Sequence, residues 1–175
     1  TWLSEEERKS SEAPLRRIVS RGGSAAAKVQ ALSALADLGL LIKKDVLSGF
    51  KDEHQGVRRN ALRVGSQSLS QDPELANGII RLLEDKDSQV QREAAYALGN
   101  YRSKEVARAL GEFIIAHSKD PYLRAAALTS SGNYPEEVLL TVLDSEESPE
   151  TSVIINELIK LSGNKSKELI SKTIS

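Results

Sequence analysis

The chain has 175 residues, no cysteine and a formal net charge of −1 at neutral pH. The lack of cysteine excludes a disulfide framework, a thiolate metal site and a cysteine nucleophile, and a dedicated nucleic-acid binder would be more basic. Aromatic residues make up only 4% of the sequence, so the core must consist of Leu, Ile, Val and Ala, which favours packed helices over a β-sandwich.

The first predicted element is a pair of helices over residues 10–39. Residues 11–20, SEAPLRRIVS, form its first helix, with Pro14 near the start, where proline is tolerated. The alanine-rich segment 22–39 forms its second helix, because its apolar residues recur at helical spacing.

Three later segments, residues 52–67, 85–100 and 118–133, repeat one another at a constant step along the chain. Each has a short turn that carries Asp, followed by an apolar helix. The aligned columns are Val57, Val90 and Leu123; Ala61, Ala94 and Ala127; and Arg58, Gln91 and Arg124. In the first pair, either Ala31 or Ala34 can occupy the alanine column. Self-similarity at a fixed period indicates stacked helix pairs.

An apolar segment precedes each of these helices, and in it Leu47, Ile80 and Phe113 recur at the same step. The sequence therefore predicts an all-α fold, an α–α superhelix of about five antiparallel helix pairs in a single domain over residues 1–175. The predicted pairs cover roughly residues 10–39, 41–69, 73–100, 103–133 and 135–163, and residues 164–175 form a tail or capping helix.

The composite pattern D-x-x-V-R-x-x-A-x-x-A-L-G resembles the HEAT repeat, in the short form shared with the HEAT-like repeats of phycobilin lyases. The resemblance covers about residues 11–163. It implies an armadillo-like helical solenoid that acts as a scaffold for protein–protein interaction. The motif is specific for the fold and says little about function, because one fold serves many functions.

A finer resemblance covers the runs RRIVSRGGSAAAKVQALSALADLGLL, VRRNALRVG and DPYLRAAALTSSG. They are similar to a HEAT segment of very large planctomycete proteins, where it lies between a sugar-dehydrogenase-like β-propeller and a haem-binding cytochrome c domain. That resemblance implies a spacer from a membrane-bound dehydrogenase, with a periplasmic or extracytoplasmic location; without it, the location would be cytoplasmic. Haem attachment needs C-x-x-C-H, so no haem is expected on this chain.

Four residues are interpreted as structural. Asp87 and Asp120 occupy positions from which a side chain accepts the first amides of the following helix. Arg58 and Arg124 are expected to link successive repeats, through the next repeat's Asp or through carbonyls at a helix end.

Gly99 and Gly132 follow the repeated helices along the chain. They are expected to end those helices in the left-handed conformation, which glycine adopts without steric cost.

The candidate partner surface consists of Arg59, Arg63, Arg92 and Tyr96. With helical spacing these residues lie on the face of the second helix of each pair that points away from the first, the concave side of a superhelix. Three guanidinium groups and a phenol are suited to an acidic peptide or a phosphate. The alternative is an ordinary solvated face, broken by Glu93.

No G-x-S-x-G, phosphate-cradling loop or H-E-x-x-H occurs, so we predict no catalytic residue, cofactor or metal ligand and no enzyme activity. The expected partner is a protein or peptide, including neighbouring domains of the same parent chain, and not a nucleic acid. Two alternatives stay open: a nucleic-acid-binding protein resembling the HEAT-like alkylation-repair glycosylases, and a protein similar to bilin lyases.

Overall fold

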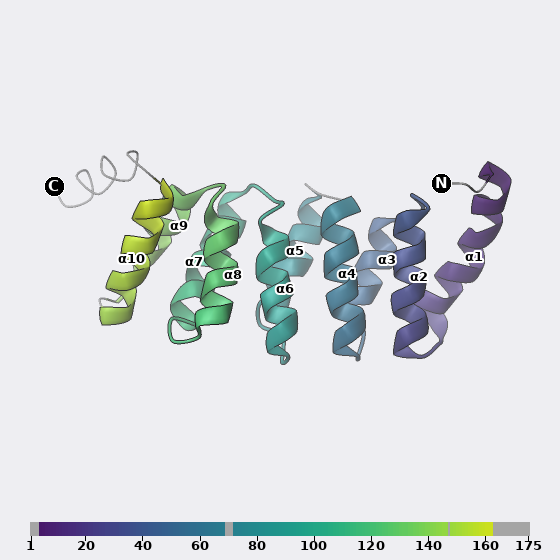
Figure 1. Cartoon of the computed structure of the whole chain (residues 1–175), viewed down its shortest axis with the longest axis horizontal. Coiled ribbons are helices and arrows are strands. Elements are labelled where there is room, and N and C mark those ends of the chain that lie inside the picture. Colours follow the sequence, from purple (N-terminus) through teal and green to yellow (C-terminus); the bar gives the residue numbers. More distant parts are fainter. Residues whose placement is uncertain (1–3, 69–71, 147, 163–175) are drawn as a thin grey trace. The chain divides into compact units, whose positions relative to one another are not determined.

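The computed structural model describes residues 4–68, 72–146 and 148–162, and within these ranges it has ten α-helices and no strand (Figure 1). This confirms the predicted all-α fold class. The predicted tail or capping helix over residues 164–175 lies outside the described residues. No helix in the described part of the chain is long and apolar enough to cross a membrane. The helices are α1 (Glu5–Arg21), α2 (Ala25–Asp37), α3 (Lys43–Phe50), α4 (Gln55–Ser68), α5 (Pro73–Leu82), α6 (Ser88–Leu98), α7 (Lys104–Ala116), α8 (Pro121–Ser131), α9 (Pro135–Leu143) and α10 (Pro149–Ser162).

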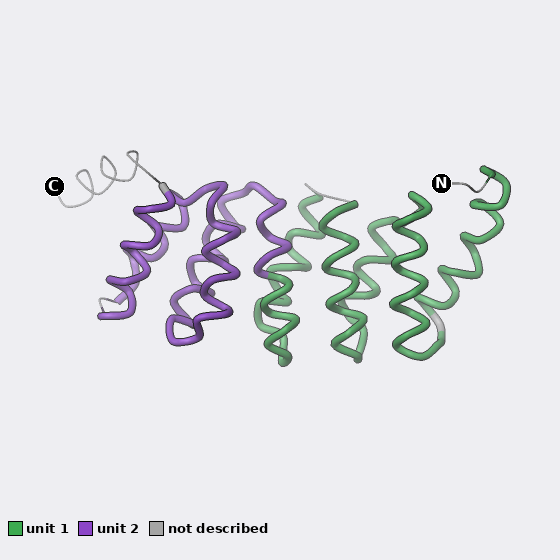
Figure 2. The backbone as a smooth tube through the Cα atoms, viewed as in Figure 1, with its two compact units in different colours: residues 1–94 green, residues 95–175 purple. Residues whose placement is uncertain are grey.

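The chain divides into two compact units, residues 1–94 and 95–175 (Figure 2). In the first unit α2 packs against α4 in one layer, while α3 packs against both α1 and α5 in the other. In the second unit α7 packs against α9, and each of these helices also contacts the helix that follows it, α8 or α10. Each unit is therefore built from helix pairs that stack in two layers.

Helix α1 begins at Glu5 and not near residue 10, which corrects the predicted position of Pro14. The hydroxyl of Ser4 accepts the amide of Glu7, and the Glu7 carboxylate accepts the amide of Ser4. This capping box, together with the acidic first turn, starts the helix early. Pro14 therefore lies inside α1 and not in its first turn.

The turns before the repeated helices share one capping arrangement. The side chains of Asp87 and Asp120 each accept two backbone amides, two and three residues further along the chain. His54 occupies the equivalent position before α4, and its Nδ1 accepts the amide of Gly56 at 3.0 Å. Three side chains at one repeat position thus accept amides that the first turn of a helix leaves free.

The expectation that Gly99 and Gly132 are left-handed is wrong. Among the glycines of the described ranges, φ angles in the region that favours glycine occur at Gly23 (140°) and Gly39 (68°), whereas φ of Gly132 is −58°. At Gly99 the constraint is packing: an added Cβ would lie 2.9 Å from Oγ of Ser130. Glycine is required there by close approach and not by backbone conformation.

The alanine column of the repeats is fully buried: Ala61, Ala94 and Ala127 each have 0% exposure. In the first unit, α3 and α4 approach each other especially closely. A Cβ built on Gly49 would lie 2.5 Å from Cβ of Ala61, and one built on Gly65 would lie 2.5 Å from Cγ1 of Val46. Small residues on both helices therefore set the distance between them.

Candidate binding surface

Arg58 of α4 is buried and joins two successive repeats within the first unit. Its Nε and Nη2 donate to the two carboxylate oxygens of Asp85, each at 2.7 Å. Its Nη1 donates to the backbone carbonyls of Asp52 and Glu53, each at 2.9 Å. One guanidinium group thus forms a bidentate ion pair and also binds carbonyls next to the end of α3.

The carboxylates of this linkage have perturbed pKa values. Burial by itself raises the pKa of Asp85. Hydrogen bonds from Arg58 and the Asp87 amide lower it, as do the positive charges of Arg58 and Lys86, and together these effects outweigh burial. The pKa of Asp52 is lowered in the same way, with Lys28 as the cation. Both pKa values therefore lie below those of ordinary aspartates.

A loss of stability in acid follows from these shifts. Above about pH 4, near the pKa of an unfolded aspartate, Asp52 and Asp85 are ionised in both states and their stabilisation is complete. Below that pH the unfolded chain takes up protons first, so the free energy of unfolding is expected to fall. Urea unfolding between about pH 6 and pH 3 measures this. Asp85→Asn should make the dependence shallower, and an unchanged slope would contradict the assignment.

Lys28 of α2 is the equivalent of Arg58 in the first repeat. Its Nζ lies 2.6 Å from Oδ2 of Asp52, just as Arg58 pairs with Asp85, the aspartate at the same position of the next inter-helix turn. Ala31, three residues after Lys28, is buried with 2% exposure, and Ala61 follows Arg58 by the same step. Ala31 and not Ala34 therefore occupies the alanine column.

The third and fourth repeats keep only part of this arrangement. The side chains of Gln91 and Arg124 donate to the carbonyls of Asp85 and Ser118, each six residues earlier. Arg124 also lies 3.6 Å from the carboxylate of Glu157 on α10. The cation of the fourth repeat thus pairs with a glutamate of α10, the second helix of the next pair, and not with an aspartate of the next turn.

Three of the four candidate surface residues belong to the first unit. Nη1 of Arg59 donates to Oε1 of Gln89 on α6, and Nη2 of Arg63 donates to Oδ1 of Asn60 at 2.9 Å. The side chain of Arg92 forms no hydrogen bond with any other described residue. Within the described ranges, none of the three arginines forms an ion pair. Arg59 and Arg92 are half-buried and Arg63 is exposed.

Tyr96 lies in the last part of α6, which belongs to the second unit. Its side chain is 45% exposed, and its backbone carbonyl accepts the hydroxyl of Ser130 on α8. Glu93, on the intervening turn of α6, is half-buried. The grouping of Tyr96 with the three arginines therefore stays a prediction.

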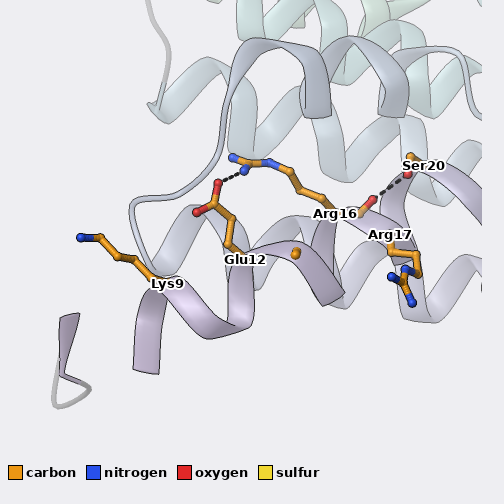
Figure 3. Close-up of a pocket in the computed structure, with 6 residues that line it drawn as sticks. Lys9, Glu12, Arg16, Arg17 and Ser20 are labelled. Carbon is orange, nitrogen blue, oxygen red and sulfur yellow. Dashed lines mark hydrogen bonds and ion pairs between the residues drawn. The ribbon is translucent and has the colours of Figure 1, made fainter. Parts of the chain in front are cut away.

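Sequence reasoning missed three depressions on the first unit, with volumes of about 400, 620 and 480 Å³. The first runs along α1, where Glu12 pairs with Arg16, the Ser20 hydroxyl donates to the Arg16 carbonyl, and the Arg17 guanidinium makes neither kind of contact (Figure 3). The second also involves α2 and α3, and the third lies between α3 and α5. None of their lining residues belongs to the predicted surface.

The sequence feature that could have pointed to this region is the run KKDVLSGFK, residues 43–51. It places lysines at both ends of one short predicted helix. No group of three or more His, Asp or Glu side chains in the described segments is placed to hold a metal ion.

Successive antiparallel helix pairs, with matching caps and buried alanines, define an α-helical repeat protein. The HEAT repeats family model matches residues 43–132, just over half of the chain and the span from α3 to α8. The chain therefore belongs to the HEAT repeat family, whose members commonly act as protein-interaction scaffolds. No curated protein matches the chain.

Proposed function

We propose that this chain is a non-enzymatic binding module, and that Arg59, Arg63 and Arg92 receive an acidic segment of a partner protein. The observation that carries the proposal is the absence of ion pairs at these three arginines among the described residues. Their positive charge is therefore available to a ligand.

The contrast with the inward cations of the same helices supports this reading. Arg58, next to Arg59 in the sequence, is buried against Asp85, and Lys28 pairs with Asp52. The chain thus supplies carboxylates to the cations that join repeats. Among the described residues no carboxylate pairs with the outer arginines, and Arg59 and Arg63 donate instead to the neutral amides of Gln89 and Asn60.

Arginine suits a carboxylate partner for geometric reasons. Its planar guanidinium group presents parallel N–H donors that match the two oxygens of one carboxylate. Arg59 donates one side-chain hydrogen bond within the described residues, to Gln89. Its Nε is buried without a partner, so a ligand meets the terminal nitrogens of the guanidinium group. An acidic side chain of a partner fits these donors without displacing an internal ion pair.

The partner that we favour is another domain of the same parent chain, with the helix pairs acting as a spacer between domains. The finer resemblance of the sequence supports an extracytoplasmic redox protein with a haem-binding domain as the parent. The complete reading frame on both sides of this chain tests that part of the proposal: a propeller before it and a C-x-x-C-H motif after it are expected.

Charge reversal tests the surface itself. Arg59→Glu combined with Arg92→Glu is expected to weaken binding to the flanking domains by at least about tenfold at low salt, measured by calorimetry. The matched control is Arg81→Glu with Lys86→Glu, which reverses two exposed charges elsewhere on the first unit. Equal binding by the two double variants would refute the role of this surface and leave the chain as a passive spacer.

A further inference from the structure

The three depressions of the first unit share walls. The one along α1 and the next one both include Ser20, and the second and third both include Ser48 and Lys51. We call the three adjoining depressions together the α3 groove. It crosses from α1 over α3 to the start of α5 and lies apart from Arg59, Arg63 and Arg92, none of which lines it.

The walls of the α3 groove carry more cations than carboxylates. Three cations on its walls, Arg17, Lys44 and Lys51, have no ion pair within the described residues. By contrast, three of its acidic residues are already neutralised. The pairs are Glu12 with Arg16, Asp52 with Lys28, and Glu74 with Lys43.

Glu53 is the remaining acidic wall residue, and it forms no ion pair in the described ranges. The pairing of Lys43 with Glu74 and Asp72 is close enough to raise the lysine pKa. Lys44 on α3 and Lys51 directly after it are both exposed and form no ion pair with a described residue.

We propose that the α3 groove binds an extended acidic polypeptide segment. Neighbouring helices lie about 8–10 Å apart, so a path from α1 across α3 to α5 measures about 16–20 Å. An extended chain rises about 3.3 Å per residue, and five or six residues therefore span the groove. Carboxylates of that segment pair with Arg17, Lys44 and Lys51.

The lining favours a polypeptide over other polyanions. The Ser48 hydroxyl and the Glu53 carboxylate can accept hydrogen bonds, which peptide N–H groups donate and a DNA phosphate backbone does not. No aromatic side chain other than the His54 ring lines the three depressions, so base stacking has little support.

The test uses the full chain with Arg59→Glu and Arg92→Glu already in place, so that the surface of the proposed function does not contribute. The probe is fluorescein-labelled decaglutamate, and its anisotropy is measured at about 20 mM salt, where exposed charges act strongly. Failure of the proposed function leaves this experiment unaffected, because its arginines are absent from every variant compared.

In that background, Lys44→Glu with Lys51→Glu is expected to weaken decaglutamate binding at least about tenfold relative to Arg81→Glu with Lys86→Glu. Both double variants change the net charge equally, and the control pair lines none of the depressions. About 0.5 M salt should abolish binding. Lys44→Gln with Lys51→Gln, which is milder for folding, should give an intermediate loss.

Three outcomes would overturn the proposal. The first is no decaglutamate binding at low salt, and the second is equal binding by the Lys44/Lys51 and Arg81/Lys86 double variants. The third is tighter, Lys44- and Lys51-dependent binding of oligothymidylate or of phosphatidylserine vesicles, which would assign the groove to a nucleic acid or a membrane. Circular dichroism melts of every variant confirm that the compared chains are folded.

Discussion

Arg58→Met is expected to lower the free energy of unfolding by about 3–5 kcal/mol, the usual cost of removing one partner from a buried ion pair. The substitution leaves Asp85 buried, with 8% side-chain exposure, and without its cation. It also removes the donor to the carbonyls of Asp52 and Glu53. Urea unfolding followed by circular dichroism at neutral pH measures the loss.

The matched control is Arg59→Met, the same substitution one residue later. Arg59 has no ion pair among the described residues, so we expect a change within about 0.5 kcal/mol. Arg58→Met combined with Asp85→Leu should be less destabilising than Arg58→Met alone, because no unpaired charge is then buried. If Arg58→Met and Arg59→Met lower the free energy of unfolding by the same amount, Arg58 does not hold the repeats together.

The repeat pattern predicted the fold well because each helix pair makes local contacts that recur at a fixed step. The columns of Ala61 and Arg58 correspond to real positions in the structure, one buried and one capping a helix end. The sequence does not decide the register of the first pair, because both Ala31 and Ala34 fit the alanine column. Only the contact of Lys28 with Asp52 identified the aligned residue as Ala31.

Two local predictions failed because they depended on context. Pro14 was assigned to a first turn, but the capping box of Ser4 and Glu7 starts the helix earlier. Gly99 was assigned a left-handed conformation from its place after a helix, whereas its close neighbour Ser130 belongs to α8, a helix of the next repeat. A single sequence shows where glycine occurs and not which distant side chain packs against it.

Helical spacing separates Arg58 from Arg59, and this is why the sequence predicts that Arg59, Arg63 and Arg92 share a face that Arg58 does not. The pairing of Arg58 with an aspartate of the next repeat was predictable, and the structure places it at Asp85. Which of the remaining cations lack an ion pair was not, because Lys28 and Lys43 find their carboxylates on other helices or turns. The α3 groove was missed for a related reason. Its walls come from α1, α3 and α5, so no single segment of sequence contains it.

Gly49→Ala is expected to lower the free energy of unfolding by about 2 kcal/mol, because it overpacks the contact between α3 and α4. The new methyl would lie 2.5 Å from Cβ of Ala61, and neither methyl can rotate away because both are attached directly to the backbone. Overpacking of this kind costs up to about 3 kcal/mol, and the higher helix propensity of alanine offsets about 1 kcal/mol of that loss. Urea unfolding measures the difference.

Two further variants separate the contact from a general effect of the substitution. Gly22→Ala adds a methyl where no atom lies within 4 Å and where φ is 160°, an extended value open to any residue, so it should change stability by less than about 0.5 kcal/mol. Gly49→Ala combined with Ala61→Gly moves the methyl from one helix to the other and should recover part of the loss. If the combined variant is less stable than the sum of the two single changes, the distance between α3 and α4 does not depend on this contact. If the combined variant instead regains stability, the space between α3 and α4 accommodates one methyl group at this contact, whichever helix carries it.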